Sequence, residues 1–234
     1  MKDAIGILGG MGPLASQLFY GMIIEKTAAS CDQDHVDLMI LSHASMPDRT
    51  EAIAGSAAEE VCALLSEDCR LLEQAGCKAV AAACNTVHYF LHRIEPSLNI
   101  PLISMIREAA DAVAARMPGQ RIAILSTQGT IQSGLYQHAL AERGMQFWVP
   151  DPNTQAIVTH VIYDCVKAGF QPDRQTLSTL AESVRTAGCS SALLACTELS
   201  VIARDWETDI ACVDPMEILA ERVIEIAGKK LKSE

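Results

Sequence analysis

Two cysteines stand in matching sequence contexts in the two halves of this chain. The segments QAGCKAVAAACNTVH and TAGCSSALLACTELS align without a gap at a constant offset of 112 residues, which places Cys84 opposite Cys196. In both segments a short run of small apolar residues ends in the cysteine, and residues that favour helix starts follow it. The pattern predicts that each thiol lies where a buried strand ends and a helix begins.

A thiol at such a junction can transfer protons. The N-terminus of a helix lowers the pKa of a cysteine from about 8.5, so part of the side chain is thiolate near neutral pH. One thiolate and one thiol on opposite faces of a substrate carbon can remove a proton from one side and deliver a proton from the other, which inverts the centre. The alternative is that Cys84 and Cys196 are only buried thiols that pack as small hydrophobic side chains.

The other cysteines do not suggest further chemistry. Cys77 and Cys189 repeat in the same alignment, but each follows a helix-ending glycine and precedes the strand, so we interpret this pair as packing. The nine cysteines form no CxxC pair and their number is odd. Neither a disulfide framework nor a metal site is therefore indicated.

The elements that position the two thiols follow from the hydrophobic pattern. Short apolar runs alternate with segments of helical length, which is typical of βα units and a parallel sheet. The predicted strands are 4–8, 36–41, 79–83, 102–103, 121–125, 146–149, 192–195 and 210–213. The predicted helices are 13–29, 56–75, 86–94, 106–116, 131–143, 154–168, 174–187 and 215–231.

This order predicts an α/β fold of two similar domains, each a mostly parallel sheet flanked by helices, with the active site in the cleft between them. We expect residues 1–103 plus 213–234 to form the first domain, with the C-terminal helix packing back onto it, and residues 104–212 to form the second. A weaker similarity between AIGILGGMGP and RIAILSTQGT supports two related halves. In this arrangement Cys84 and Cys196 approach the cleft from opposite sides.

The composition restricts partners and location. The formal net charge is −11 and the sequence holds no block of Lys or Arg, so we expect neither nucleic acid nor a membrane surface as a partner. No apolar run approaches the roughly 20 residues of a membrane span, and the N-terminal apolar run is too short for a signal peptide. We therefore expect a cytoplasmic protein that binds a small molecule.

Four motifs carry a resemblance to a known family. GILGGMGPLAS, SHASMPDRT, ACNTVHYF and ACTELS occur in this order over nearly the whole chain. They resemble the aspartate/glutamate racemase superfamily, whose members use two cysteines and no pyridoxal phosphate. Glutamate racemases carry Asp-Ser-Gly after the first strand and Cys-Thr-His in the last motif. Here Gly9, Gly10 and Met11 follow the strand and Glu198 replaces that His, so the chain looks like the aspartate racemase branch.

The resemblance implies racemisation of an acidic amino acid, aspartate first of all, by a homodimer without cofactor or metal. It implies Cys84 and Cys196 as the two acid/base residues. Arg49 matches the substrate-binding arginine of the family, and Lys167 resembles a second cation. A dicarboxylate substrate needs such local positive charge in an acidic protein. Lys167 also has an ordinary explanation as a charge near the C-terminal end of its helix.

Further candidates for substrate binding lie beside the two cysteines and in the glycine-rich loop. They are Met11, Asn85, Thr86, Thr197 and Glu198. The Asn and Thr side chains can cap helix N–H groups or bind a carboxylate. Glu198 can orient Cys196 or receive the substrate ammonium, and is also an ordinary acid in a first helical turn. His88, one turn beyond Cys84, is either structural or catalytic.

Other functions stay open at this point. One is a glutamate racemase or a racemase of broad specificity. Another is a relative such as maleate isomerase, in which one cysteine attacks a double bond, or a decarboxylase that needs one thiol. A third is a non-catalytic amino-acid-binding protein. A dinucleotide site is disfavoured, because GILGGMGP lacks the G-x-G-x-x-G spacing and the second strand ends in Ser42 and His43 without an acidic residue for a ribose.

Overall fold

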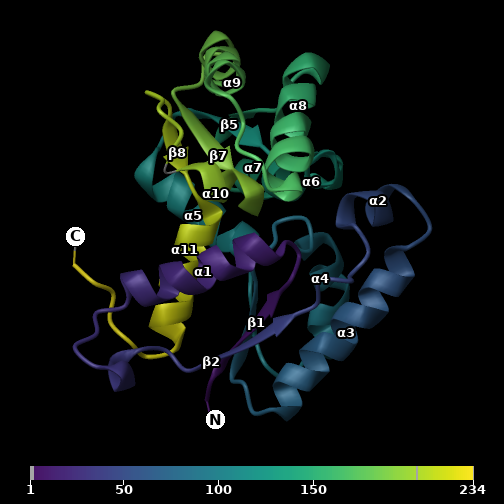
Figure 1. Ribbon diagram of the computed structural model, residues 1–234, viewed down its shortest axis with the longest axis vertical. Helices are drawn as coiled ribbons and strands as arrows, with labels where there is room; N and C mark the ends of the chain where they lie inside the picture. Colours follow the sequence, from purple (N-terminus) through teal and green to yellow (C-terminus); the bar gives the residue numbers. More distant parts are fainter. Residues whose placement is uncertain (1–2, 204, 234) are drawn as a thin grey trace.

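The computed structural model describes residues 3–203 and 205–233, and contains two four-stranded parallel sheets flanked by helices (Figure 1). The first sheet has the order β2-β1-β3-β4 and the second the order β6-β5-β7-β8. The predicted α/β fold with two similar halves is confirmed. The first sheet consists of β1 (Ile5–Gly9), β2 (Leu38–Ser42), β3 (Ala79–Ala82) and β4 (Leu102–Ile103). The second consists of β5 (Arg121–Leu125), β6 (Gln146–Trp148), β7 (Ser191–Leu194) and β8 (Ala211–Val213).

The strand register places the two cysteines in equivalent positions. In the first sheet Ile5 of β1 pairs with Ala79 of β3, and in the second Ile122 of β5 pairs with Ser191 of β7. All four residues of β3 and of β7 are buried, as strands covered by helices on both faces must be. Cys84 and Cys196 therefore follow the central strands of their sheets on the carboxyl side.

The first sheet is covered on both faces. The helices around it are α1 (Pro13–Lys26), α2 (Arg49–Ala54), α3 (Ala58–Gln74), α4 (His88–Ile94) and α11 (Pro215–Ile226). Side chains of α3 and α4 pack in one core cluster, whereas Phe19 of α1 packs with Met216 and Leu219 of α11 in another. The last helix thus lies beside α1 in the first half of the molecule (Figure 1).

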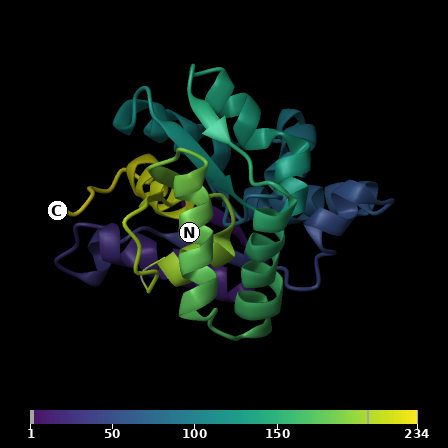
Figure 2. The same ribbon diagram turned by 90° about the horizontal axis from the view of Figure 1, so that it is seen from above.

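The second sheet is covered in the same way. Its helices are α5 (Met105–Arg116), α6 (Gln128–Ser133), α7 (Leu135–Ala141), α8 (Pro152–Thr159), α9 (Arg174–Thr186) and α10 (Thr197–Ala203). Viewed from above, the green helices of the second half, α8 and α9 among them, lie toward the viewer (Figure 2). Helix α5 joins the halves, because Met105 packs in the core of the first sheet and Ala109 in that of the second.

The predicted domain boundaries stay a prediction. Residues 1, 2, 204 and 234 of the predicted domains lie outside the described residues. No helix within the described part of the chain is both long and apolar enough to cross a membrane.

Several predicted helix limits were wrong, each for a local reason. The helix predicted over 131–143 is two helices, because Gly134 has a φ of +69° and ends α6. The helix predicted over 86–94 begins at His88. The short helix α2 was not predicted. Its start is marked by Asp48, whose carboxylate accepts hydrogen bonds from the backbone N–H groups of Thr50 and Glu51.

The segment predicted as one helix over 154–168 changes type along its length. It begins two residues earlier, at Pro152 behind the cap of Asp151, and forms the α-helix α8. A π-helical turn, η3 (His160–Cys165), and a 3-10 turn, η4 (Val166–Ala168), follow before Gly169 ends it at a φ of +85°. The wider π turn carries Tyr163, and η4 carries Lys167, toward the other half of the molecule.

Candidate active site

A small inner cavity between the two halves is lined by every site residue predicted from the sequence. These residues are Met11, Arg49, Asn85, Thr86, Cys84, Lys167, Cys196, Thr197 and Glu198, and they are joined by Asp48, Thr50, Thr127 and Tyr163. The space inside it that a water molecule can reach is only about 10 Å³, which is roughly what is needed to admit a single water. A second cavity of about 320 Å³ shares four of these residues and leads away from the inner one.

Both thiols lie just beyond the carboxyl ends of central strands, and both are almost fully buried. Cys84 and Cys196 each expose 5% of their surface. The residue before each is tied to the neighbouring central strand, since Ala83 N–H donates to Leu8 O and Ala195 N–H donates to Leu125 O. The backbone therefore delivers both side chains to one cavity from the two opposing sheets.

His88 fixes the backbone of Cys84. Its ring is buried, and Nε2 lies 3.1 Å from the N–H of Met105 at the start of α5. Because that N–H can only donate, Nε2 must accept, so the proton is on Nδ1, which donates to Cys84 O at 2.9 Å. Burial lowers the pKa of His88 to about 4. We conclude that His88 is a neutral tie between the Cys84 loop and α5, and not a proton donor to substrate near neutral pH.

Cys196 is held as a thiol. Its Sγ donates to Glu198 Oε2 at 3.0 Å. Burial, and after it the carboxylate of Glu198, raises the pKa of Cys196 well above its ordinary value. The expectation that a helix start lowers the pKa of both cysteines was therefore wrong for Cys196. The following helix α10 has only seven residues, and its dipole is outweighed by a buried carboxylate in direct contact.

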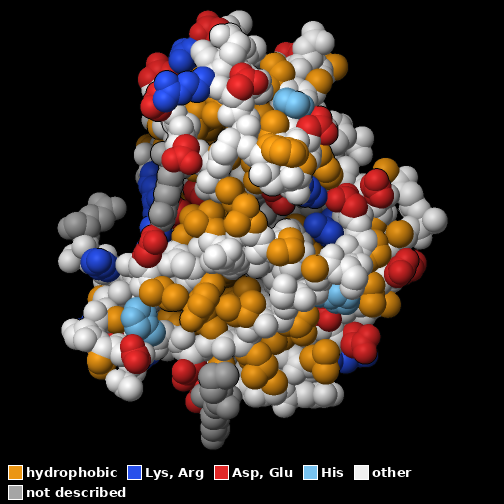
Figure 3. All heavy atoms as spheres, viewed as in Figure 1, with side chains coloured by type: hydrophobic (Ala, Val, Ile, Leu, Met, Phe, Trp, Pro, Cys, Tyr) orange, Lys and Arg blue, Asp and Glu red, His pale blue; other side chains and the backbone are white. Residues whose placement is uncertain are grey.

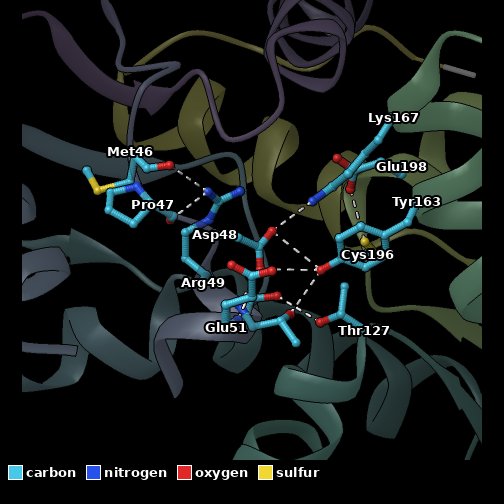
Figure 4. A network of polar contacts seen from close by, with 12 residues as sticks. Met46, Pro47, Asp48, Arg49, Glu51, Thr127, Tyr163, Lys167, Cys196 and Glu198 are labelled. Atoms are coloured by element: carbon cyan, nitrogen blue, oxygen red, sulfur yellow. Dashed lines mark hydrogen bonds and ion pairs between the residues drawn. The ribbon is translucent and has the colours of Figure 1, made fainter. Parts of the chain in front are cut away.

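The opposite charge stands beside Cys84. Arg49 is buried at the start of α2, where Nη1 donates to Met46 O at 3.3 Å and to Pro47 O at 3.0 Å (Figure 4). Burial by itself lowers the pKa of Arg49, but the charges of Cys84 and Asp48 and a side-chain hydrogen bond to Cys84 outweigh it, so the pKa is raised. The buried Nε of Arg49 has no partner in the described structure. The two thiols thus have unlike neighbours, a guanidinium and a carboxylate.

A polar contact across the cleft closes the cavity. Lys167 Nζ lies 3.3 Å from Asp48 Oδ2 and 4.2 Å from the centre of the Tyr163 ring, and Tyr163 Oη lies 3.2 Å from Thr50 Oγ1 (Figure 4). Burial lowers the pKa of Lys167, but the charges of Glu198, Tyr163 and Asp48 raise it overall. Lys167 therefore stays a cation.

The sequence analysis missed the partners in this contact. Asp48 stands next to Arg49 in the motif, and Tyr163 precedes Lys167 by four residues, which is one helical turn. That spacing was a usable signal, because residues four apart lie on one face of a helix. Thr50 and Thr127 carried no comparable signal.

The remaining polar residues predicted for the site form hydrogen bonds with buried side chains around the cavity. Thr86 Oγ1 lies 3.1 Å from Thr127 Oγ1 and 2.8 Å from Thr130 Oγ1, which connects the two halves. Asn85 Oδ1 accepts from the hydroxyl of Tyr136, and Thr197 Oγ1 lies 3.4 Å from Glu198 Oε2. Helix α4 begins without a side-chain cap, so Asn85 and Thr86 are not its cap residues.

The glycine-rich loop after β1 has a structural role. Gly10 has a φ of +86°, and a Cβ there would lie 2.5 Å from His43 N, so only glycine fits. Its N–H already donates to Ser16 Oγ at 2.8 Å and is not free for a substrate carboxylate. Met11, the next residue, is buried at the cavity wall. Over residues 3–203 and 205–233, no three His, Cys, Asp or Glu side chains are placed to hold a metal ion.

Comparisons with known proteins place the chain among racemases. The family described as Asp/Glu/Hydantoin racemase matches residues 8–223. The broad specificity amino-acid racemase RacX of Bacillus subtilis is 27% identical over 225 residues, which cover 94% of this chain and 96% of that protein. A glutamate racemase of Koribacter versatilis is 28% identical over 172 residues, which cover 68% of this chain and 56% of that protein.

A solved structure is similar over its whole length. The aspartate racemase of Picrophilus torridus superposes with a TM-score of 0.87 and 31% sequence identity, and the match covers 98% of this chain and 96% of that one. Sequence and structure lead to the same result: the chain belongs to the Asp/Glu/hydantoin racemase family.

Proposed function

We propose that this chain is a racemase of aspartate that uses two thiols and no added cofactor. The observation that carries the proposal is the placement of Cys84 and Cys196. They follow equivalent strands of two opposed sheets, line one cavity, and have unlike charges beside them. Inversion by proton transfer requires one group that accepts a proton on one side of the substrate carbon and one group that donates a proton on the other side.

The charges set the direction of the first step. Arg49 forms a hydrogen bond with Cys84, and in this proposal Cys84 takes the α-proton of one enantiomer and becomes a thiol. Cys196, protonated beside Glu198, donates its proton to the opposite face of the same carbon and becomes a thiolate. One C–H bond breaks and one forms, and the number of protons on the two sulfurs is unchanged. The reverse reaction starts from the state that this leaves.

Cations and amide donors in the cavity stabilise the intermediate. The α-proton of an amino acid is weakly acidic, so negative charge that develops on the carbon and its carboxylate needs preorganised positive partners. Arg49, which is buried and has an unpaired Nε, and the more exposed Lys167 are the cations that line the cavity. Lys167 also contacts Asp48 across the cleft, which holds its charge beside the site.

Aspartate is the preferred substrate in this proposal, with Arg49 and Lys167 as partners for its two carboxylates. The similar structure from Picrophilus torridus is an aspartate racemase, which supports this choice. A broad specificity is the second candidate, and the similarity to RacX along almost the whole chain favours it.

The test is α-proton exchange followed by NMR in D2O. L-aspartate, D-aspartate, L-glutamate and D-glutamate are offered separately without added cofactor. We expect deuterium at Cα of both aspartates together with loss of optical activity, and slower or no exchange with glutamate. Equal rates for all four would support the broad specificity. No exchange and no racemisation with any amino acid tested would overturn the proposed function.

A homodimer in the cytoplasm is part of the proposal. Exposed apolar side chains gather over α1 and β2 (Figure 3), and they include Leu14, Tyr20, Ile24 and Ile40. The strand β2 lies at the edge of its sheet, where a second copy of this chain can cover the patch. Sedimentation velocity would give a dimer for the wild type and a monomer for Ile40→Glu, and a monomeric wild type would contradict the proposal.

The proposed location in the cytoplasm is supported by the nine free thiols, because cysteines stay reduced in such a compartment.

A further inference from the structure

Asn85 lines the inner cavity, and the NH2 group of its side-chain amide has no hydrogen-bond partner. The residue exposes 2% of its surface and lines the inner cavity together with both cysteines. Its Oδ1 accepts a hydrogen bond, whereas its buried Nδ2 has no partner among the described residues. Leaving a buried N–H group without an acceptor is unfavourable, so the unpaired Nδ2 of Asn85 points to a ligand atom as its acceptor.

Tyr136 is the group on the other end of that amide. It belongs to α7 in the second half, is fully buried, and lines neither the inner nor the outer cavity. Its hydroxyl lies 2.5 Å from Asn85 Oδ1, a separation typical of a short O–H···O bond. Tyr136 therefore contacts a residue of the site, Asn85, but does not line the cavity itself.

The hydroxyl proton decides which way the amide of Asn85 faces. Burial, and then the charges of Asp214 and Cys196, raise the pKa of Tyr136 well above its ordinary value, so the phenol keeps its proton. That proton needs an acceptor, and Asn85 Oδ1 is its hydrogen-bond partner. If the amide were reversed, Nδ2 would face the hydroxyl and the phenol proton would have no acceptor there.

We propose that Tyr136 is a positioning residue, which holds Asn85 Oδ1 so that Nδ2 donates to a carboxylate oxygen of the substrate. The inference rests on the proposed function, since it takes the ligand to be an acidic amino acid. It adds that the donor is oriented from the other half of the molecule. Asn85 follows β3 and Tyr136 lies on α7, so the amide faces correctly only when the two halves are together.

The test is a double-mutant cycle on Tyr136→Phe and Asn85→Ala. The Phe variant keeps the ring that fills the core and removes only the hydroxyl. We expect the KM for aspartate to rise about tenfold in either single variant, with a much smaller change in kcat, because a ground-state contact is lost. In the double variant we expect no further rise, since Tyr136 acts through Asn85. Tyr89→Phe, at an exposed tyrosine of α4, is the control and should behave as wild type.

A binding measurement separates this inference from the proposed function. Succinate is the probe, because it has two carboxylates but no α-proton to transfer. Calorimetry should show the same tenfold loss of affinity in both single variants and no additional loss in the double variant. If this pattern holds while no amino acid is racemised, the proposed function fails and the role of Tyr136 stands. If the effect of Tyr136→Phe persists in full in the Asn85→Ala background, the role of Tyr136 is overturned.

The wild-type protein provides a check that does not depend on the folding of any variant. In a 15N correlation spectrum, we expect the side-chain NH2 signals of Asn85 to shift when succinate is added and saturates the site. Unchanged Asn85 signals at saturation, or no binding of succinate to the wild type, would contradict the proposal.

Discussion

Cys196 Sγ donates to Glu198 Oε2 at 3.0 Å, whereas the guanidinium of Arg49 stands beside Cys84. The two thiols occupy equivalent places in two sheets of the same strand order, but they are not equivalent electrostatically. The fold is therefore symmetric at the level of strands and asymmetric at the level of charge. In the proposed reaction, Cys196 therefore serves as the acid of the first step and Cys84 as the base.

The first prediction concerns thiol reactivity. Because burial and Glu198 raise the pKa of Cys196, little of it is thiolate at pH 7.5, and iodoacetamide should alkylate Cys84 before Cys196. Glu198→Gln removes the negative charge, lowers the pKa of Cys196, and should speed its alkylation about tenfold. Mass spectrometry of the digested protein measures both sites. Equal alkylation of the two sites in the wild type would contradict the assignment.

The second prediction separates the two thiols in catalysis. Cys84→Ala or Cys196→Ala should reduce racemisation by about 10³-fold, because either proton transfer is lost. Each variant should still exchange the α-proton of one enantiomer, since the remaining thiol faces one side of the carbon. Exposed Cys31, which lines neither cavity, offers the control Cys31→Ala. Full racemisation by either active-site variant would exclude the two-thiol mechanism.

The third prediction is a pH dependence of stability due to His88. Its pKa is about 4 in the folded protein and about 6.5 unfolded, so the unfolded chain binds a proton more readily. The free energy of unfolding contributed by His88 is complete above pH 6.5 and falls by about 3 kcal/mol as the pH drops to about 4. Urea unfolding of wild type and His88→Asn at several pH values should show their difference shrinking over this range.

Asp214 must be separated from that measurement. Burial raises the pKa of Asp214 to about 6, so its contribution to stability increases as the pH falls from about 6 toward 4, opposite in sign to that of His88. Comparing His88→Asn with wild type cancels this contribution, because both proteins retain Asp214. A difference that does not change between pH 7 and pH 4 would show that His88 is not held neutral.

The fourth prediction concerns Lys167. Lys167→Met keeps much of the length of the side chain but removes the charge that faces Asp48 and the cavity. We expect the KM for aspartate to rise at least about tenfold, because a charge-assisted contact to a substrate carboxylate is lost. Steady-state kinetics measure this change. Lys230→Met, at an exposed lysine near the C-terminus, should leave the KM unchanged, and an equal effect of both variants would point to net charge alone.

The sequence pattern was sufficient to predict the fold, and its motifs identified residues that line the inner cavity. Small apolar runs followed by Cys84 and Cys196 predicted two strand ends, because strand and turn preferences act over a few neighbouring residues. The motifs then predicted nine residues that all line one cavity. The break at Gly134 and the π turn before Lys167 escaped prediction, since both depend on backbone geometry that the hydrophobic period does not reveal.

Sequence alone determined the identity and spacing of the two thiols, their position after two similar strands, and the cations available to them. Only the tertiary structure decided the protonation of Cys196, the neutral tie at His88 and the orientation of Asn85 by Tyr136. The physical reason is that pKa values and amide orientation depend on burial and on the nearest charges and donors. Glu198 and His88 lie close in sequence to the cysteines that they contact, but the burial that shifts their pKa values and those of the thiols, and the contact of Tyr136 with Asn85, arise only when the two sheets and their helices pack together.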